Sequence, residues 1–316
     1  MNLLYSLMIL FSWVFLSGVI FLAGAYTSRL YVTGPSGAEA CFPGGRNKCF
    51  GETVAKYIFL IAVLTLLANA VHFVLHCAIM TDTSLKEVFS ILPTFLTKTK
   101  YGRFTIIRTV FLAAIIVVSF AGVYRDQKWA TLSGALLSLL LLVAIAMSGH
   151  QGAKGYMNFP FFLDTLHLVA VSLWIGGVIF IRFFLSAFVK GAYVEFWRNV
   201  KSLMNRFSLL ATYCVFIAAF TGVLLSYVNV KGFSVLLNTS YGIVLFVKIL
   251  LVGIIVIIGG MNKFSVIPQM NNIKTEESSE SMAHGRKLLN LVTIEAGLGF
   301  LVLLLTSLLT HLSPEG

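Results

Sequence analysis

Histidine is the residue type with the clearest chemical potential in this sequence, because its neutral imidazole ring binds transition metals. His72 and His76 are four positions apart, a spacing that places both rings on one face of a helix. Asp164 lies three residues before His167, so its carboxylate could orient that ring behind a bound metal. The other histidines are His150, His284 and His311. The pattern predicts metal ligands on several different segments.

Sulfur-containing side chains near these histidines narrow the choice of metal. Cys77 and Met80 follow His76, and Met147 lies three residues before His150. Thiolate and thioether sulfur favour Cu(I), and imidazole suits copper, zinc, iron and nickel, whereas calcium and magnesium prefer carboxylates. Only 12 Asp and Glu residues occur in the chain. The donor set therefore points to copper ahead of the hard cations.

The elements that must carry these ligands are long and apolar. Of the 316 residues, 58% are hydrophobic and 11% are charged, against about 25% charged in soluble globular proteins. Runs of about 20 apolar residues cross a bilayer as helices, and none alternates as a membrane β-strand would. We expect one all-α, polytopic membrane domain over residues 1–316, a bundle of about eight helices. The expected spans are residues 4–26, 55–79, 104–124, 130–148, 161–185, 208–229, 241–261 and 288–311.

The distribution of Lys and Arg predicts the orientation of these spans. Roughly two thirds of the 23 basic residues lie in the odd-numbered connections, which are therefore expected in the cytoplasm, with both termini external. In this orientation every histidine except His284 lies at or near the external face. The net charge of +11 is then explained by basic residues on the cytoplasmic side, where anionic lipid headgroups lie. It is no evidence for nucleic-acid binding, because no nucleic-acid-binding module accompanies it.

Each candidate ligand also has a structural interpretation, which the sequence leaves open. Histidines at helix ends, such as His72, His76, His150 and His311, can be solvated at the membrane interface. His167 is expected deeper in its span, where an ordinary interhelical hydrogen bond would explain it. Metal binding and structural roles are therefore both retained for every histidine.

The positions of the cysteines do not identify a single role for them. Cys41 and Cys49 enclose a Gly- and Pro-rich segment that the predicted orientation places in the cytoplasm. Their spacing fits a disulfide, two reduced thiols or a weak metal contact. Cys214 lies in an apolar run and is interpreted as a small buried hydrophobic residue.

Three further features inside the spans could serve either packing or a pathway. Trp174 precedes the pair Gly176-Gly177, which indicates close helix packing or a constriction. Lys248 and Glu295 are charges within apolar runs. Such residues are costly in lipid, so they either reach an interface, pair inside the bundle or assist a cation.

Several short motifs carry a resemblance to a known family. They are Ser148-Gly149-His150, Asp164-x-x-His167 followed by Trp174-x-Gly176-Gly177, Arg206-Phe207-Ser208, Thr221-Gly222, Tyr241-Gly242 with Lys248, and Asn262 with Pro268. Their order and spacing resemble the copper resistance D family, most clearly from Gly149 to Pro268. The segment Thr81 to Leu112, with a semi-polar helix and Tyr101-Gly102-Arg103, is similar to that family's external segment.

The resemblance implies an eight-helix bacterial inner-membrane protein linked to copper uptake, often beside a periplasmic copper chaperone. Two departures stand out: the first span contains no histidine, and the Cys41 to Cys49 insert is foreign to the family pattern. No chaperone domain is fused to this chain, so such a partner would be separate.

The residues and the resemblance together predict a copper-binding plasma-membrane protein that takes copper from the outer face and moves it inward. The expected ligands are His72, His76, His150 and His167, with lesser roles for His311, Met80 and Met147. Asp164, Trp174, Lys248 and Glu295 are expected in a supporting shell or pathway. The alternatives are a transmembrane electron-transfer protein in which the histidines bind haem b, and a subunit that assembles a copper enzyme without transport. An enzyme is not expected, because no phosphate-binding loop, nucleophile elbow or zinc-protease motif occurs.

Overall fold

The computed structural model describes residues 3–33, 50–124, 127–149, 158–188, 194–229, 238–272 and 279–312, and every regular element in these ranges is helical. This confirms the all-α prediction. The elements are α1 (Leu3–Ser28), η1 (Arg29–Thr33), α3 (Phe50–Thr81), α4 (Leu85–Lys98), α5 (Lys100–Tyr124), α6 (Gln127–Ser148), α8 (Phe159–Phe188), α9 (Val194–Asn229), α11 (Ser240–Met261), η2 (Asn262–Val266), α12 (Ile267–Asn272) and α13 (Ser279–Leu309).

The described residues contain eight helical segments long and apolar enough to cross a membrane, which confirms the predicted number. Most extend beyond the apolar runs, because polar and basic residues continue a helix into the headgroup region. The sixth segment, for example, begins at Lys201 where residue 208 was predicted. The last prediction was too long at its end: the helix stops at Leu309, and His311 lies in the turn that follows.

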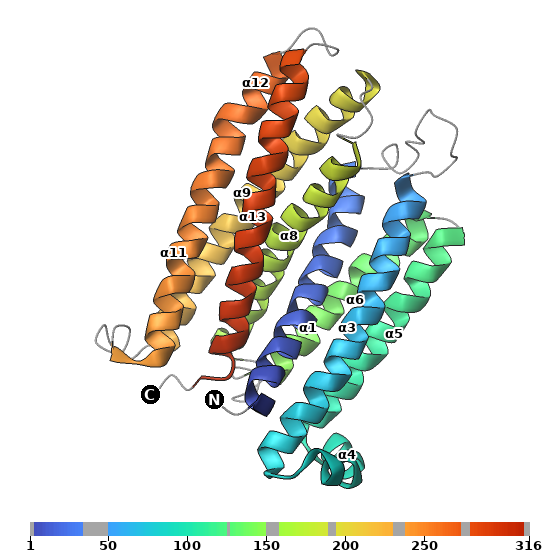
Figure 1. Cartoon of the computed structure of the whole chain (residues 1–316), viewed down its shortest axis with the longest axis vertical. Coiled ribbons are helices and arrows are strands. Elements are labelled where there is room, and N and C mark those ends of the chain that lie inside the picture. Colours follow the sequence, from blue (N-terminus) through green and yellow to red (C-terminus); the bar gives the residue numbers. More distant parts are fainter. Residues whose placement is uncertain are drawn as a thin grey trace.

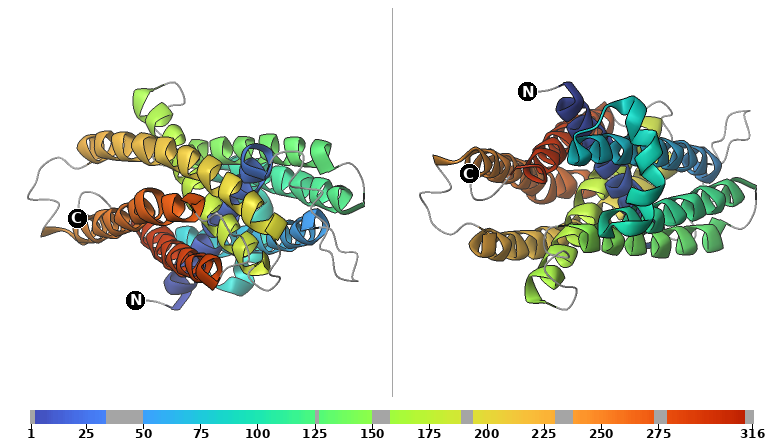
Figure 2. Two further views of the ribbon diagram at one scale, coloured as in Figure 1. Left: turned by 90° about the horizontal axis from the view of Figure 1, so that it is seen from above. Right: turned by 90° about the horizontal axis from the view of Figure 1, so that it is seen from below.

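Helix α1 lies at the centre of the bundle and packs against α3, α6, α8 and α13 (Figures 1 and 2). Its closest approach is to α8, where a Cβ atom added to Gly176 would lie 2.1 Å from the Ile20 carbonyl oxygen. A Cβ on Gly24 would likewise lie 2.2 Å from the backbone of Gly176. In lipid, helices associate through such close backbone packing because no hydrophobic force drives them together.

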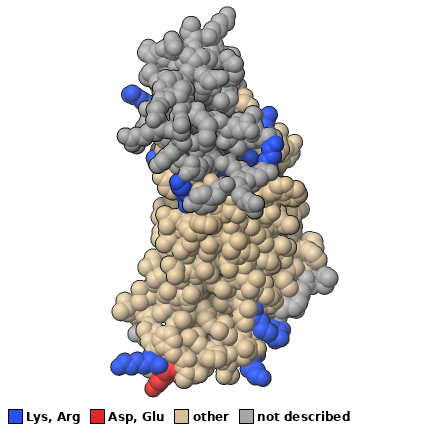
Figure 3. Space-filling view, turned by 90° about the vertical axis from the view of Figure 1, so that its right-hand side faces the viewer, with Lys and Arg blue, Asp and Glu red and all other residues tan. Residues whose placement is uncertain are grey.

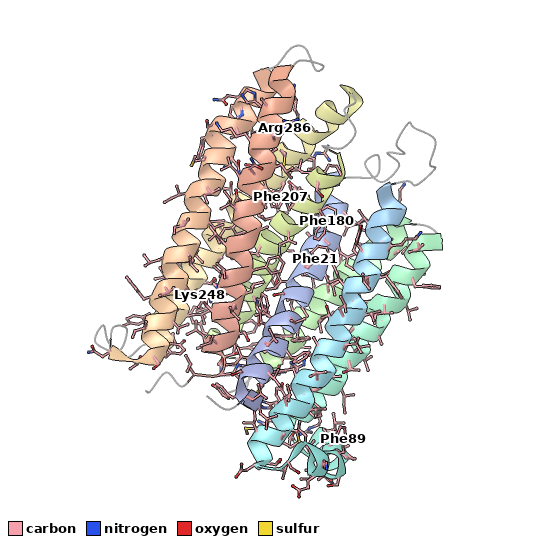
Figure 4. All side chains as sticks on the ribbon, viewed as in Figure 1. Phe21, Phe89, Phe180, Phe207, Lys248 and Arg286 are labelled. Carbon is pink, nitrogen blue, oxygen red and sulfur yellow. The ribbon has the colours of Figure 1, made fainter. Side chains whose placement is uncertain are left out.

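Two groups of helices flank the central pair α1 and α8. On one side α3, α5 and α6 pack together, and on the other α13 packs between α8 and α11 (Figure 1). A Cβ on Gly18 would overlap the Thr65 hydroxyl group of α3, and one on Gly134 of α6 would overlap the Tyr26 ring. These small residues bring α3 and α6 close to α1. Figure 4 shows Phe21 and Phe180 in the central core.

Helix α4 is short and lies outside the bundle at the end of α3 and α5 (Figure 1). Ser84 and Glu87 form a capping box that starts it. Val88 packs on Cys77 of α3, whereas the next residue, Phe89, points away from this contact and is 64% exposed (Figure 4). The sequence predicted a semi-polar helix in this segment, and the structure contains one.

Both chain termini lie at the end of the bundle that carries α4, which we call the termini end (Figure 1). The Tyr5 hydroxyl donates a hydrogen bond to the His311 carbonyl oxygen over 2.9 Å, and this contact ties the two ends of the chain together. In the face shown in Figure 3, the coloured charges lie toward the two ends, with an uncharged belt between them. The structure thus agrees with termini on one side of the membrane, and their external location stays a prediction. Cys41 and Cys49 lie outside the described residues.

Candidate metal centre

Three of the predicted ligands come together at the termini end. The rings of His72 and His76, one turn apart on α3, have centroids 6.0 Å apart. The His311 ring packs edge-on against His72 with a centroid distance of 5.9 Å. The turn after α13 carries His311 to this position, although it is far from α3 in sequence. We call these residues, with Tyr101 and Arg108 described next, the histidine cluster.

Tyr101 and Arg108 complete the histidine cluster from α5. The Tyr101 hydroxyl lies 3.2 Å from Nδ1 of His72, and its ring centroid lies 4.3 Å from that of His76. The Arg108 guanidinium is sandwiched between the Tyr101 ring at 5.1 Å and the Phe15 ring at 5.4 Å.

Sequence reasoning gave no site role to Tyr101 or Arg108. Arg108 lies within α5 and is only 4% exposed. A basic residue four positions into a predicted span was the signal that could have found it, because such a charge is rare without a function.

The hydrogen bonds of His311 favour ligand binding through its Nε2 atom, and His72 also presents Nε2 without a partner. Nδ1 of His311 lies 2.7 Å from the Ser307 carbonyl oxygen, which can only accept, so Nδ1 carries the proton and Nε2 holds the lone pair. His72 is 7% exposed, and its Nε2 atom is buried without a hydrogen-bond partner. A buried polar atom with no partner costs roughly 1–3 kcal/mol. A bound metal ion would remove that cost.

The described contacts of this cluster include none of the predicted sulfur ligands. Met80 is 65% exposed, and Cys77 is buried in the contact between α3 and α4. Met147 is half-buried near the end of α6, and His150 lies outside the described residues. Within the described ranges, no three His, Cys, Asp or Glu side chains are placed so that they could share a metal ion. The histidine cluster thus offers neighbouring imidazoles rather than a preformed three-ligand site.

His167 belongs to a second site, on α8. Its Nδ1 atom lies 3.1 Å from the Ala218 carbonyl oxygen and 3.0 Å from the Thr221 hydroxyl, both on α9. The carbonyl fixes the proton on Nδ1 and leaves Nε2 unprotonated, as in many metal-bound histidines. Gly222 makes room for the ring, because a Cβ there would lie 3.2 Å from its Cε1 atom.

Two groups of α9 hold Nδ1 of His167, the Ala218 carbonyl oxygen and the Thr221 hydroxyl. The orienting role expected for Asp164 stays a prediction. Asp164 interacts electrostatically with Lys248 of α11, which also interacts with His167. Figure 4 shows Lys248 in the half of α11 nearer the termini end. An acidic and a basic residue inside the bundle thus compensate each other next to His167.

The Trp174 segment serves helix packing, one of the two roles left open by its sequence. Trp174 is buried in the core. Gly176 contacts α1, and a Cβ on Gly177 would lie 2.5 Å from the Phe207 ring of α9. The central helix α1 lies between α3, which carries the histidine cluster, and α8, which carries His167 (Figure 1). Among the described residues, the predicted histidine ligands therefore form two groups, one at α3 and one on α8, and α1 packs against both helices.

This fold and these buried polar groups define an all-α, multi-pass membrane protein. Residues 2–158 match the family model of the copper resistance protein D-like N-terminal domain, and residues 201–309 match that of copper resistance protein D. The chain belongs to the copper resistance protein D family and is a multi-pass inner-membrane protein. These matches confirm the resemblance seen in its motifs.

Three curated relatives are similar to this chain. Copper resistance protein D of Pseudomonas syringae pv. tomato is 27% identical over 268 residues, which cover 80% of this chain and 82% of the relative. Copper transport protein CutJ of Bacillus subtilis is 29% identical over 113 residues, 34% of this chain but 19% of CutJ. Inner membrane protein YebZ of Escherichia coli is 28% identical over 152 residues, 48% of each chain. The chain thus spans less than two thirds of CutJ and of YebZ. No solved structure matches it.

Proposed function

We propose that this protein takes up copper at the histidine cluster and moves it across the inner membrane toward the cytoplasm. The observation that carries the proposal is the buried, unpartnered Nε2 atom of His72 beside the rings of His76 and His311. Metal–imidazole bonds are about 2 Å long, so two ring nitrogens on one ion lie within about 4 Å. Rings with centroids about 6 Å apart reach that separation by side-chain rotation. The names of two relatives, a copper transport and a copper resistance protein, support copper as the ion.

The charge of the cluster favours Cu(I) over Cu(II). Its ligands are neutral imidazoles, and its one formal charge is the buried Arg108 guanidinium. At a separation of about 6 Å and an effective dielectric constant near 20, a unit charge on the metal is disfavoured by about 3 kcal/mol, and a double charge by twice that. Cu(I) also accepts low coordination numbers with soft and imidazole ligands, which suits a pair of neighbouring histidines.

His167 is the second copper-binding position on the proposed path. It lies eight residues into α8, roughly 12 Å from the start of that helix, and its Nε2 atom is unprotonated. Asp164 compensates the positive charge of Lys248 there, which lowers the barrier for a cation. The membrane potential assists inward movement by about 2.3 kcal/mol per charge per 100 mV. A separate external copper chaperone would deliver the ion to the termini end.

Uptake of Cu(I) into proteoliposomes tests this proposal. We expect His167→Ala to reduce the initial uptake rate at least tenfold, because the second ligand is lost, while copper binding at the histidine cluster persists. His284→Ala is the matched control, since His284 lies near the start of α13 at the opposite end. Uptake by His167→Ala at the wild-type rate would contradict the path. Binding without uptake in the wild type would instead favour the copper-enzyme assembly subunit.

A further inference from the structure

A second pair of buried polar residues lies away from both histidine sites. Asn262 ends α11 and begins the π-helical turn η2, and Glu295 faces it from α13. The Asn262 amide nitrogen donates a short hydrogen bond to Glu295 Oε1. Each residue is 6% exposed. Because α11 starts at the termini end and Asn262 is its C-terminal cap, the pair lies toward the opposite end of the bundle (Figure 1).

The nearest basic side chains are engaged elsewhere. Lys263, the next residue after Asn262, donates from Nζ to the Thr212 hydroxyl of α9 over 2.7 Å. Arg182 of α8 donates from Nε to the Thr293 hydroxyl over 2.6 Å, one turn from Glu295 on α13. In the described residues, Glu295 therefore has an amide as its partner and no cation.

The other elements packed against Glu295 bring no charge next to it. Helices α1 and α12 contain no Asp, Glu, Lys or Arg. Lys248 on α11 is fourteen residues before Asn262, roughly 21 Å along the helix. On α13 itself, Arg286 and Lys287 are nine and eight residues before Glu295, roughly 13 and 12 Å away along the helix (Figure 4 labels Arg286). An ionised carboxylate at Glu295 would thus be a buried charge without a counter-ion, which is strongly unfavourable.

The side chain of Asn262 lacks one hydrogen-bond donor. Its Oδ1 atom is buried and has no hydrogen-bond donor. A carboxylate only accepts, so an ionised Glu295 can never satisfy that oxygen, whereas a protonated carboxyl group has an O–H that can. A carboxylic acid and a primary amide can then exchange two hydrogen bonds, one in each direction.

The local backbone is suited to such a site. Helix α11 changes to π-helical geometry at Asn262, whose N–H is shared between the carbonyl oxygens of Ile258 and Gly259. Single π-helical turns inside helices occur frequently at functional sites. Gly259 of α11 lies beside the pair, because a Cβ there would be at an ordinary contact distance of 3.9 Å from Glu295 Oε2.

We propose that Glu295 and Asn262 form a proton-binding site of this protein, separate from the histidine cluster and from His167. The bound proton resides on the Glu295 carboxyl group, whose O–H donates a hydrogen bond to Asn262 Oδ1. Loss of the proton leaves a charged carboxylate and an unpaired amide oxygen at the junction of α11 and η2. Binding and release of the proton therefore favour different arrangements of these two elements. The proposal does not depend on copper transport.

Labelling with dicyclohexylcarbodiimide tests the site in the purified wild-type protein. This reagent adds to a protonated carboxyl group and rearranges to a stable acylurea that retains the whole reagent mass, so labelling reports protonation. Glu87, at the start of α4 outside the bundle, is the internal control, because its carboxylate takes part in an exposed capping box. At pH 7.5 we expect at least tenfold more adduct on Glu295 than on Glu87 by peptide mass spectrometry, and none at that position in Glu295→Gln.

Three results would overturn the proton site. The first is the absence of a Glu295 adduct at every pH from 5.5 to 8.5. The second is a pH dependence of the Glu295 adduct that matches that of Glu87. The third is suppression of labelling by 150 mM sodium chloride but not by choline chloride, which would assign the pair to a metal cation instead. Each measurement uses folded wild-type protein, so a misfolded variant cannot produce the result.

Discussion

Replacing His72 with alanine is expected to lower the copper bound by the purified protein from about one ion per chain to less than a tenth of that value. His72 holds the central position of the histidine cluster, because its ring contacts both His76 and His311. Its Nε2 atom is buried and has no hydrogen-bond partner, so a bound cation would remove the free-energy cost of leaving it unpaired. Removal leaves His76 and His311 without the ring that links them.

The measurement is elemental analysis for copper, iron and zinc, combined with an absorption spectrum of the detergent-purified protein. His284→Ala is the matched control and should keep its copper, because His284 lies near the other end of α13. A His72→Ala protein that retains one copper ion per chain would contradict the assignment of the cluster. An intense Soret band with about one iron per chain would instead favour haem b and electron transfer, with the same histidines as axial ligands.

The helical architecture was predictable because its signals are local. A run of about 20 apolar residues must become a helix in lipid, since each backbone polar group has to be satisfied within the segment. The number of spans followed directly from the number of such runs. Helix ends were less predictable, as at Val194 and Leu309, because a helix stops where its backbone finds caps and partners, not where its apolar residues end.

The candidate site was only partly predictable, because it depends on contacts between distant segments. The pairing of His72 with His76 follows from a spacing of four residues on one helix. No periodicity could show that His311 packs against His72, or that Tyr101 reaches the same ring from α5. For the same reason, the sequence could not show that Ala218 and Thr221 of α9 hold Nδ1 of His167.

The contacts of α1 explain why two histidine groups form in place of one. Gly24 and Gly176 bring α1 against α8, while Gly18 brings it against α3. The ligand-bearing helices α3 and α8 are therefore held on different sides of one helix at a fixed spacing. Because α1 packs against both ligand-bearing helices, its packing on α8 is expected to affect transport as well as stability.

The substitution Gly176→Ala tests that packing and is expected to destabilise the protein severely. The added Cβ would lie 2.1 Å from the Ile20 carbonyl oxygen and 3.1 Å from Gly24 Cα, which are backbone atoms that cannot rotate away. The two helices must therefore separate along their contact. Overpacking of this kind costs about 1–3 kcal/mol, and more where the backbone has to shift.

Gly253→Ala on α11 is the matched control, because a Cβ there meets no atom within 4 Å. In a thermal unfolding experiment in detergent, we expect the midpoint for Gly176→Ala to fall by roughly 10 °C, given about 2–4 °C per kcal/mol for a chain of this size. Gly253→Ala should stay within about 2 °C of the wild type. Equal midpoints for the two variants would show that α1 and α8 are not in backbone contact, and the separation of the two histidine groups by α1 would then lose its structural basis.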